Sequence, residues 1–169
     1  GCGDKTILLN NLKKNYCNFD RIKIIKENSL NLKANKIMND AKKKSRLFII
    51  DGGHTYDVVY NDLILAEKVL CEGGIIIVDD VFDFSFPQVS VAFLDFLKLN
   101  NHLIPFLMVE DKVFLTNSSI FSTSYFNYFS SLQSEFIIKR TEYLSNDVII
   151  IKNSHYDFLR NSKIWQKIK

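Results

Sequence analysis

Two uninterrupted apolar segments, separated by one amphipathic helix, constrain this 169-residue chain more than any other feature. The first segment, RLFIID, covers residues 46–51, and the second, IIIVDD, covers residues 75–80. Strands that are buried on both faces of a parallel sheet have this continuous apolar character. A helix is predicted over residues 58–70 because apolar side chains recur there at helical spacing, at Val59, Leu63, Ala66 and Leu70. The pattern therefore predicts a β-α-β unit.

The segments around this unit extend the prediction to an α/β fold with a doubly wound, mostly parallel sheet. RIKIIKENS, residues 21–29, predicts a strand before the unit, and CEGG predicts that the helix stops at Gly73 or Gly74. Residues 104–117 predict a C-terminal antiparallel hairpin. Further helices are predicted over 5–14, 32–44 and 89–99, and a late strand over 147–152.

The last third of the chain has a less regular pattern. Residues 118–136 are rich in Ser, Phe and Tyr, which fits either a helix packed on the sheet or a lid on the substrate side. Residues 158–169 predict a basic helix or tail. We therefore expect one domain over residues 1–117, lacking its N-terminal part, and an unassigned extension over 118–169 that packs on the same domain.

The composition favours a cytoplasmic protein. Hydrophobic residues make up 47% of the chain, the net charge is only +3, and the three cysteines form no CxxC pair. The dense lysine run, residues 42–44, is typical of a solvated helix end rather than a nucleic-acid patch. The lysine pattern therefore gives no reason to expect nucleic acid as a partner. No apolar stretch is long enough for a bilayer, so a membrane is not an expected partner either. A homo-oligomeric state is left open.

Acidic residues end both apolar strands, with Asp51 after the first and Asp79 and Asp80 after the second. Ligands of open α/β sheets bind beyond the carboxyl ends of the strands. Three carboxylates in one crevice repel each other unless a cation lies among them, and oxygen ligands suit Mg²⁺ or a similar divalent ion. His54 follows on the Gly52–Gly53 turn, where its imidazole is a candidate general base.

Each residue also has a structural interpretation. Asp51 alone is typical of a turn or helix cap, a single loop histidine is often structural, and one residue of an Asp-Asp pair often caps while the other is solvated. The functional hypothesis depends on the combination, because D-G-G-H and D-D fall at the same ends of two strands joined by one helix.

Residues 48–80, FIIDGGHTYDVVYNDLILAEKVLCEGGIIIVDD, resemble the second half of a class I S-adenosylmethionine-dependent methyltransferase, which has a Rossmann-like fold. The likeness is to the divalent-metal-dependent sugar and small-molecule O-methyltransferases, the group of macrocin O-methyltransferase and the cephalosporin-hydroxylase-like proteins. The shared pattern is an apolar strand, D-G-x-H-x-Y, a helix carrying Asp62-Leu63, a Gly-Gly pair, and an apolar strand that ends in two acids.

The resemblance implies S-adenosyl-L-methionine and Mg²⁺, or another divalent cation, as cofactors. It implies that Asp51, Asp79 and Asp80 are the metal ligands and that His54 is the catalytic base. The residues implied in cofactor binding are Asp4 at the ribose, Asn28 and Ser29 at the adenine, and Asp51. The implied reaction is transfer of a methyl group to a hydroxyl of a sugar or another small molecule.

One part of the family pattern is missing from this sequence. Such enzymes bind the methionine part of the cofactor on a glycine-rich loop after the first strand, and GCGD at residues 1–4 has no strand before it. We expect that the first strand and its loop are absent from this chain.

Two other functions are left open. The first is a truncated or degenerate methyltransferase-like domain without catalysis, which the missing loop favours. The second is a metal-dependent glycosyltransferase that uses VDDVFD, although Asp80 and Asp83 are spaced too widely for its D-x-D motif.

Overall fold

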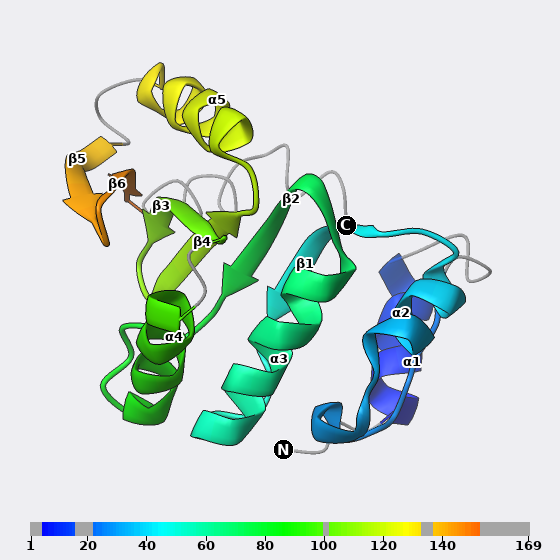
Figure 1. Ribbon diagram of the computed structural model, residues 1–169. Coiled ribbons are helices and arrows are strands. Elements are labelled where there is room, and N and C mark those ends of the chain that lie inside the picture. Colours follow the sequence, from blue (N-terminus) through cyan, green and yellow to red (C-terminus); the bar gives the residue numbers. More distant parts are fainter. Residues whose placement is uncertain (1–4, 16–21, 100–101, 133–136, 153–169) are drawn as a thin grey trace.

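The computed structural model describes residues 5–15, 22–99, 102–132 and 137–152, which form a six-stranded sheet with helices on both faces (Figure 1). The strand order across the sheet is β1-β2-β4-β3-β6-β5. The strands are β1 (Ser45–Ile50), β2 (Leu70–Val78), β3 (Ile104–Val109), β4 (Lys112–Thr116), β5 (Ile137–Tyr143) and β6 (Asn146–Ile151). The helices are α1 (Lys5–Asn15), α2 (Ala34–Ala41), α3 (Tyr56–Val69), α4 (Pro87–Leu99) and α5 (Ser119–Ser130), with a short 3-10 turn, η2 (Ser29–Asn31).

The predicted α/β class is confirmed, and four of the six strands share one direction. β1 and β2 are parallel, with Ile50 level with Val78, and β3 and β6 are also parallel. β4 runs antiparallel to β2 and to β3, and β5 runs antiparallel to β6. β3 and β4 form the predicted hairpin, and α3 joins β1 to β2 as the predicted crossover.

The sheet separates two apolar cores because neighbouring residues of a strand point to opposite faces. On one face, α3 and α4 pack on Ile76, Val78 and Leu115, and the side chains of Leu63 and Phe93 are fully buried there. On the other face, the aromatic side chains of α5 pack on strand residues; this second cluster includes Ile75, Phe106, Phe114, Tyr125 and Phe129. Residues 119–130 therefore form a helix packed on the sheet, the first of the two predicted alternatives.

Two predictions about secondary structure are wrong, and one strand is missing from the prediction. Residues 22–28 form no strand, and residues 29–31 are the 3-10 turn η2, so β1 is the first described strand. Gly73 and Gly74 do not stop α3, which already ends at Val69, because Leu70 turns to an extended conformation and pairs with Ser45 of β1. The third error is an omission, since β5 was not predicted and forms a second antiparallel hairpin with β6.

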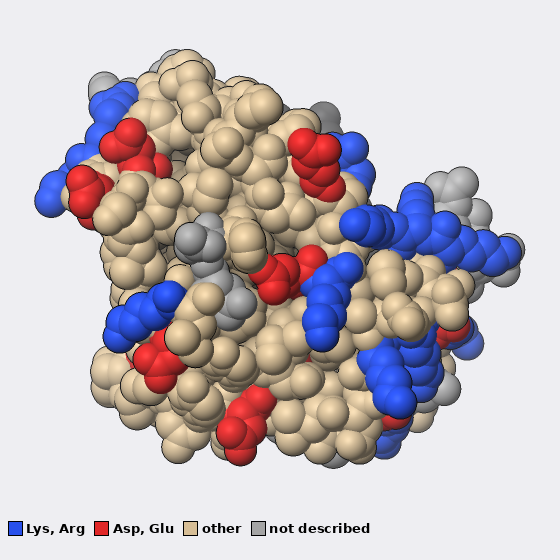
Figure 2. All heavy atoms as spheres, viewed as in Figure 1, with Lys and Arg blue, Asp and Glu red and all other residues tan. Residues whose placement is uncertain are grey.

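The lysine run behaves as predicted, as an exposed helix end. Lys42 is the C-cap of α2 in the left-handed conformation, and Lys43 and Lys44 are exposed. Figure 2 shows Lys and Arg gathered over the part of the surface that α1 and α2 occupy. No described helix combines the length and the hydropathy that crossing a bilayer requires. The basic segment at 158–169 lies outside the described residues, and the boundary after residue 117 stays a prediction.

Candidate functional site

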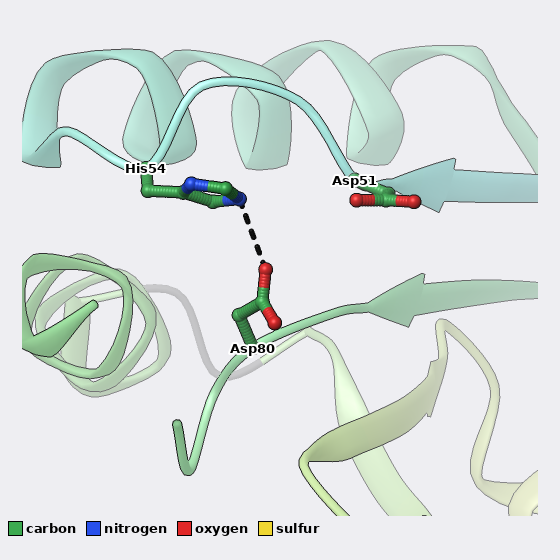
Figure 3. A group of neighbouring side chains, drawn as sticks. All are labelled: Asp51, His54 and Asp80. Atoms are coloured by element: carbon green, nitrogen blue, oxygen red, sulfur yellow. Dashed lines mark ion pairs between the residues drawn. The ribbon is translucent and has the colours of Figure 1, made fainter. Parts of the chain in front are cut away.

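The acids that end β1 and β2 lie at the same edge of the sheet. The two strands are parallel and Ile50 is level with Val78, so Asp51 and Asp79 leave the sheet side by side. The Asp79 amide donates a hydrogen bond of 3.0 Å to the Ile50 carbonyl, which extends the pairing by one residue beyond β2. The chain then turns, and the Asp80 side chain points toward the turn that follows β1 (Figure 3).

Asp51, His54 and Asp80 form one group, in which one ligand atom of each residue lies within 4.8 Å of the others. Nε2 of His54 is 2.9 Å from Oδ2 of Asp80, and Figure 3 shows the imidazole reaching across from the turn to the acid. The Asp80 side chain is 17% exposed and the His54 side chain 33% exposed. The group is therefore partly screened from water but open on one side.

Asp80 has unusual backbone and electrostatic properties. Its φ is 60°, in the left-handed region that few residues other than glycine adopt, and such outliers concentrate at functional sites. Burial raises the pKa of its carboxyl group, and the charge of the neighbouring Asp79 raises it further, against the opposing effect of His54. The flanking amides hold the conformation, since the Asp80 amide donates to Oδ1 of Asp79 and the Val81 amide donates to the Asp111 carbonyl.

Asp79 has a different set of partners. Its Oδ1 accepts a hydrogen bond from Nζ of Lys112, which also lies 3.1 Å from Asp111. Lys112 reaches this place because β4 runs antiparallel to β2, so that the start of β4 lies beside the end of β2. Burial opposes the charged form of Lys112, but its hydrogen bonds to Asp79 and Asp111 outweigh this effect and raise its pKa. A second acidic group contains Asp79, Asp80 and Asp111.

The structure thus divides the predicted metal ligands between two overlapping groups. Asp80 belongs to both, Asp51 belongs to the first and Asp79 to the second. Two carboxylates and an imidazole within 4.8 Å of one another can coordinate a divalent cation with oxygen and nitrogen ligands. In the described structure the ammonium group of Lys112 also pairs with Asp79.

Gly52 and Gly53 in the turn after β1 are not needed for unusual backbone angles, although glycine in a turn often has that role. Neither Gly52 nor Gly53 has a φ in the left-handed region, so the turn does not require glycine for its backbone angles. A side chain at Gly53 would come within 3.1 Å of Val58 on α3, so the turn packs closely on the helix that follows it. The ring of Phe86 lies 3.8 Å from the His54 imidazole, centre to centre, and fixes that side of the ring.

The residues expected at the cofactor lie against α3. Asn28 caps η2 through a 3.0 Å bond from the Leu30 amide to its Oδ1, which leaves the amide group of the Asn28 side chain for a ligand. The Ser29 carbonyl accepts a 2.8 Å bond from Asn61. Asp4, the residue expected at the ribose, lies outside the described residues.

Asp62 connects the Ser29 region to the turn after β1. Burial raises the pKa of its carboxyl group, and hydrogen bonds with Ser29 and Asn61 act in the opposite direction. One of its oxygens, Oδ2, would lie 3.6 Å from a Cβ atom at Gly52. Oδ1 of Asp62 is buried and has no hydrogen-bond partner among the described residues.

Sequence reasoning did not identify three residues of the site. Lys112 and Asp111 lie in the predicted hairpin turn, and placing that hairpin beside β2 would have brought them next to Asp79. Phe86 lies in an irregular segment, where no periodic signal marks it as the partner of His54. Asp83 turns out to be a local turn residue, because its Oδ1 accepts a 2.7 Å bond from the Ser85 amide.

Comparison with known proteins gives a match to a family model and a match to a solved structure. A family model described as a methyltransferase domain matches residues 9–81. The apo structure of a TDP-rhamnose 3′-O-methyltransferase of calicheamicin biosynthesis aligns with a TM-score of 0.45 and 16% identity. That alignment covers 54% of this chain and 39% of the other chain. No curated protein matches the chain.

The family match includes the whole of β1, α3 and β2, together with Asp51, His54 and Asp80. It ends one residue after Asp79 and Asp80. Residues 9–81 of the chain are thus similar to a methyltransferase domain.

Proposed function

We propose that the protein transfers a methyl group from S-adenosyl-L-methionine to a hydroxyl oxygen of a small molecule, with His54 as the general base and a divalent cation at the acids. The observation that carries this proposal is the group of Asp51, His54 and Asp80 at the ends of two parallel strands. An imidazole paired with a partly buried carboxylate is an arrangement suited to accepting a proton.

The contact with Asp80 decides which nitrogen of His54 we propose as the base. In neutral histidine one ring nitrogen carries the proton and the other accepts one. We place the proton of neutral His54 on Nε2, the nitrogen that lies 2.9 Å from Oδ2 of Asp80. Nδ1 is then the atom that takes the acceptor's hydroxyl proton, and the Asp80 carboxylate stabilises the imidazolium that results.

The methyl transfer balances without an additional reactant. The acceptor oxygen forms a bond to the methyl carbon, the bond from that carbon to the sulfonium sulfur breaks, and the hydroxyl proton moves to Nδ1 of His54. The remaining contribution of the protein is to hold the two reactants in line, and effects of proximity alone are worth about 7–11 kcal/mol in well-oriented systems. Phe86, packed on the imidazole, keeps the base in one orientation.

Asp51 and Asp80 are the residues that would hold the cation, with Asp79 available once Lys112 moves away. When bound, a divalent cation supplies positive charge that neutralises these carboxylates and favours the ionised form of a hydroxyl beside it. Asn28, Ser29 and Asp51 would contact the cofactor, and Asp4 is proposed at its ribose. A sugar hydroxyl is the acceptor that we propose.

Calorimetric titration of the full-length protein with S-adenosylhomocysteine, with and without MgCl₂, tests the proposal. We expect binding in both conditions and a separate Mg²⁺ affinity that Asp51→Ala removes. His102→Ala is the matched control for substitutions of His54, because His102 is an exposed histidine remote in sequence from the acids. If the full-length protein does not bind S-adenosylhomocysteine, the proposed activity is wrong.

A further inference from the structure

A cavity of about 470 Å³ begins at the residue that follows Asp80. Its walls come from three parts of the chain, namely the segment from Val81 to Phe84, one side of α4, and Tyr143 at the end of β5. The Asp83 amide donates a 3.3 Å hydrogen bond to the Asp80 carbonyl. The segment that lines the cavity is therefore attached to Asp80, the partner of the candidate base His54. The same segment continues to Phe86, which packs on His54.

The walls of the cavity are mainly aromatic and aliphatic. Phe82 and Val91 are half exposed, and Phe84 is 95% exposed although its side chain is large and apolar. Leu94 of α4 completes the apolar wall, and the rings of Phe82 and Tyr143 meet edge to face at 6.1 Å. Exposed apolar side chains that gather around a cavity are typical of a ligand site.

One hydroxyl donor of the lining remains available to a ligand. The Ser90 hydroxyl already donates to the Val81 carbonyl, and Asp83 already accepts from the Ser85 amide. The Tyr143 hydroxyl has no hydrogen-bond partner among the described residues, and burial raises the pKa of this group, so it stays protonated at neutral pH. An apolar pocket with one oriented donor is the usual composition of a small-molecule site.

Tyr143 is held in place by an unusual turn. Leu144 and Ser145 join β5 to β6, and both have positive φ, 49° and 59°. Two successive positive φ values match the tight hairpin turn in which Asn-Gly is the preferred sequence. Leu and Ser adopt this conformation only at a cost in backbone strain, and strained turns of this kind concentrate at functional sites.

We propose that this cavity binds an apolar ring of the acceptor, placed next to the hydroxyl that is methylated, and that Tyr143 donates a hydrogen bond to it. This inference rests on the proposed function and specifies its substrate class as an amphipathic compound, with a hydroxyl-bearing part at His54 and an aromatic or alicyclic part in the cavity. Tyr143 lies outside residues 9–81, so acceptor choice comes from a part of the chain beyond the family match.

Binding of two glucosides to the full-length protein, without cofactor or metal, tests the inference. 4-Nitrophenyl β-D-glucoside carries an aromatic ring, and methyl β-D-glucoside is the matched probe without one. We expect the aryl glucoside to bind at least about tenfold more tightly in an NMR titration, since burying one ring gives more than about 1.4 kcal/mol. Equal affinities of the two glucosides, or no binding of the aryl glucoside at millimolar concentration, would overturn the inference.

Two substitutions on one helix locate the site. Val91→Trp fills the cavity and should weaken aryl glucoside binding about tenfold or more, whereas Leu99→Trp, also on α4 and exposed but outside the cavity, should leave it within about twofold. Phe84→Ser is a second variant that preserves the fold, because Phe84 is almost fully exposed. Tyr143→Phe should weaken binding about threefold to tenfold, the value of one hydrogen bond.

The outcomes for the cavity and for the proposed function are separable. If S-adenosylhomocysteine binds but Val91→Trp leaves aryl glucoside affinity unchanged, the inference about the cavity fails and the proposed function stands. If the aryl glucoside binds in the cavity and S-adenosylhomocysteine does not bind at all, the ligand class of the cavity is supported and the proposed function fails.

Discussion

Replacing Gly73 by alanine should destabilise the protein more than any other single-methyl addition at a described glycine. Gly73 lies within β2 with a φ of 66°, and a Cβ atom there would lie 2.5 Å from Cγ and Cδ2 of the Phe121 ring on α5. The backbone cannot easily relax, because the Gly73 amide donates to Asn117 at 2.9 Å and its carbonyl accepts from the Tyr125 hydroxyl at 2.6 Å. The new methyl group therefore has to displace the ring.

The expected loss has two components. A left-handed conformation costs a non-glycine residue about 1–2 kcal/mol. Inserting a methyl group into a filled space costs about 1–3 kcal/mol. The smaller conformational freedom of alanine in the unfolded chain returns about 0.4–1 kcal/mol. The net decrease in the free energy of unfolding is about 2–4 kcal/mol, which lowers the Tm by about 5–15 °C for a chain of this length.

Urea unfolding followed by circular dichroism measures this loss, with Gly52→Ala as the matched control. A Cβ at Gly52 would meet only Asp62 Oδ2 at 3.6 Å, an ordinary contact, and its φ is not left-handed, so its change should stay within about 0.5 kcal/mol. Phe121→Ala combined with Gly73→Ala separates the two components. Without the ring, only the conformational cost remains, and the coupling energy between the two sites should be about 1–3 kcal/mol.

Two results would refute this reasoning. If Gly73→Ala unfolds within about 0.5 kcal/mol of the parent, neither the φ nor the ring contact constrains the site as described. If the loss is full-sized but unchanged in the Phe121→Ala background, the ring is not the obstacle and the backbone angle alone accounts for it.

Three further predictions concern the site. His54→Ala should keep Mg²⁺ affinity largely intact and reduce methyl transfer by about 10²–10⁴-fold, the usual contribution of a general base, whereas Asp51→Ala should lose both; an unchanged rate for His54→Ala would reject the base. Lys112→Met should tighten Mg²⁺ binding several-fold in calorimetry, because Asp79 loses its competing cation; weaker binding would contradict this. Asp62→Asn should become more stable relative to the parent as the pH rises. Because the pKa of Asp62 is raised in the folded protein, its carboxyl group contributes fully to the free energy of unfolding below the ordinary carboxyl pKa of about 4, and this contribution is lost above the folded pKa. Equal pH profiles of the two proteins in urea unfolding would exclude a raised pKa.

The β-α-β unit and its acids could be predicted from sequence because each depends on local pattern. β1, α3 and β2 are apolar with a clear period, and parallel strands joined by a helix bring Asp51 and Asp80 to one edge. Residues 22–28 have strand-like composition, but strand formation depends on a neighbour with which to pair, and the described structure gives them none.

The errors at the other end of the fold have a related cause. β5 is an outer strand that carries Lys139, Arg140 and Glu142, and charges of this kind protect exposed sheet edges while concealing the strand in a hydropathy pattern. The pairing of Asp79 with Lys112 depends on which strand lies next to β2, and no local pattern contains that information. The tertiary arrangement, rather than the residues themselves, decides these contacts.

The pairing of β6 with β3 has a consequence for the order in which the protein is made. β1 to β4 can pair among themselves as soon as Thr116 has left the ribosome, whereas β6 joins β3 only after the chain has continued through α5 and β5. Domains fold as they emerge, from the N-terminus onward. Tyr143 is therefore the last of the cavity walls to be made, and we expect nascent chains that stop before it to have the acids and His54 in place before the cavity beside them is closed.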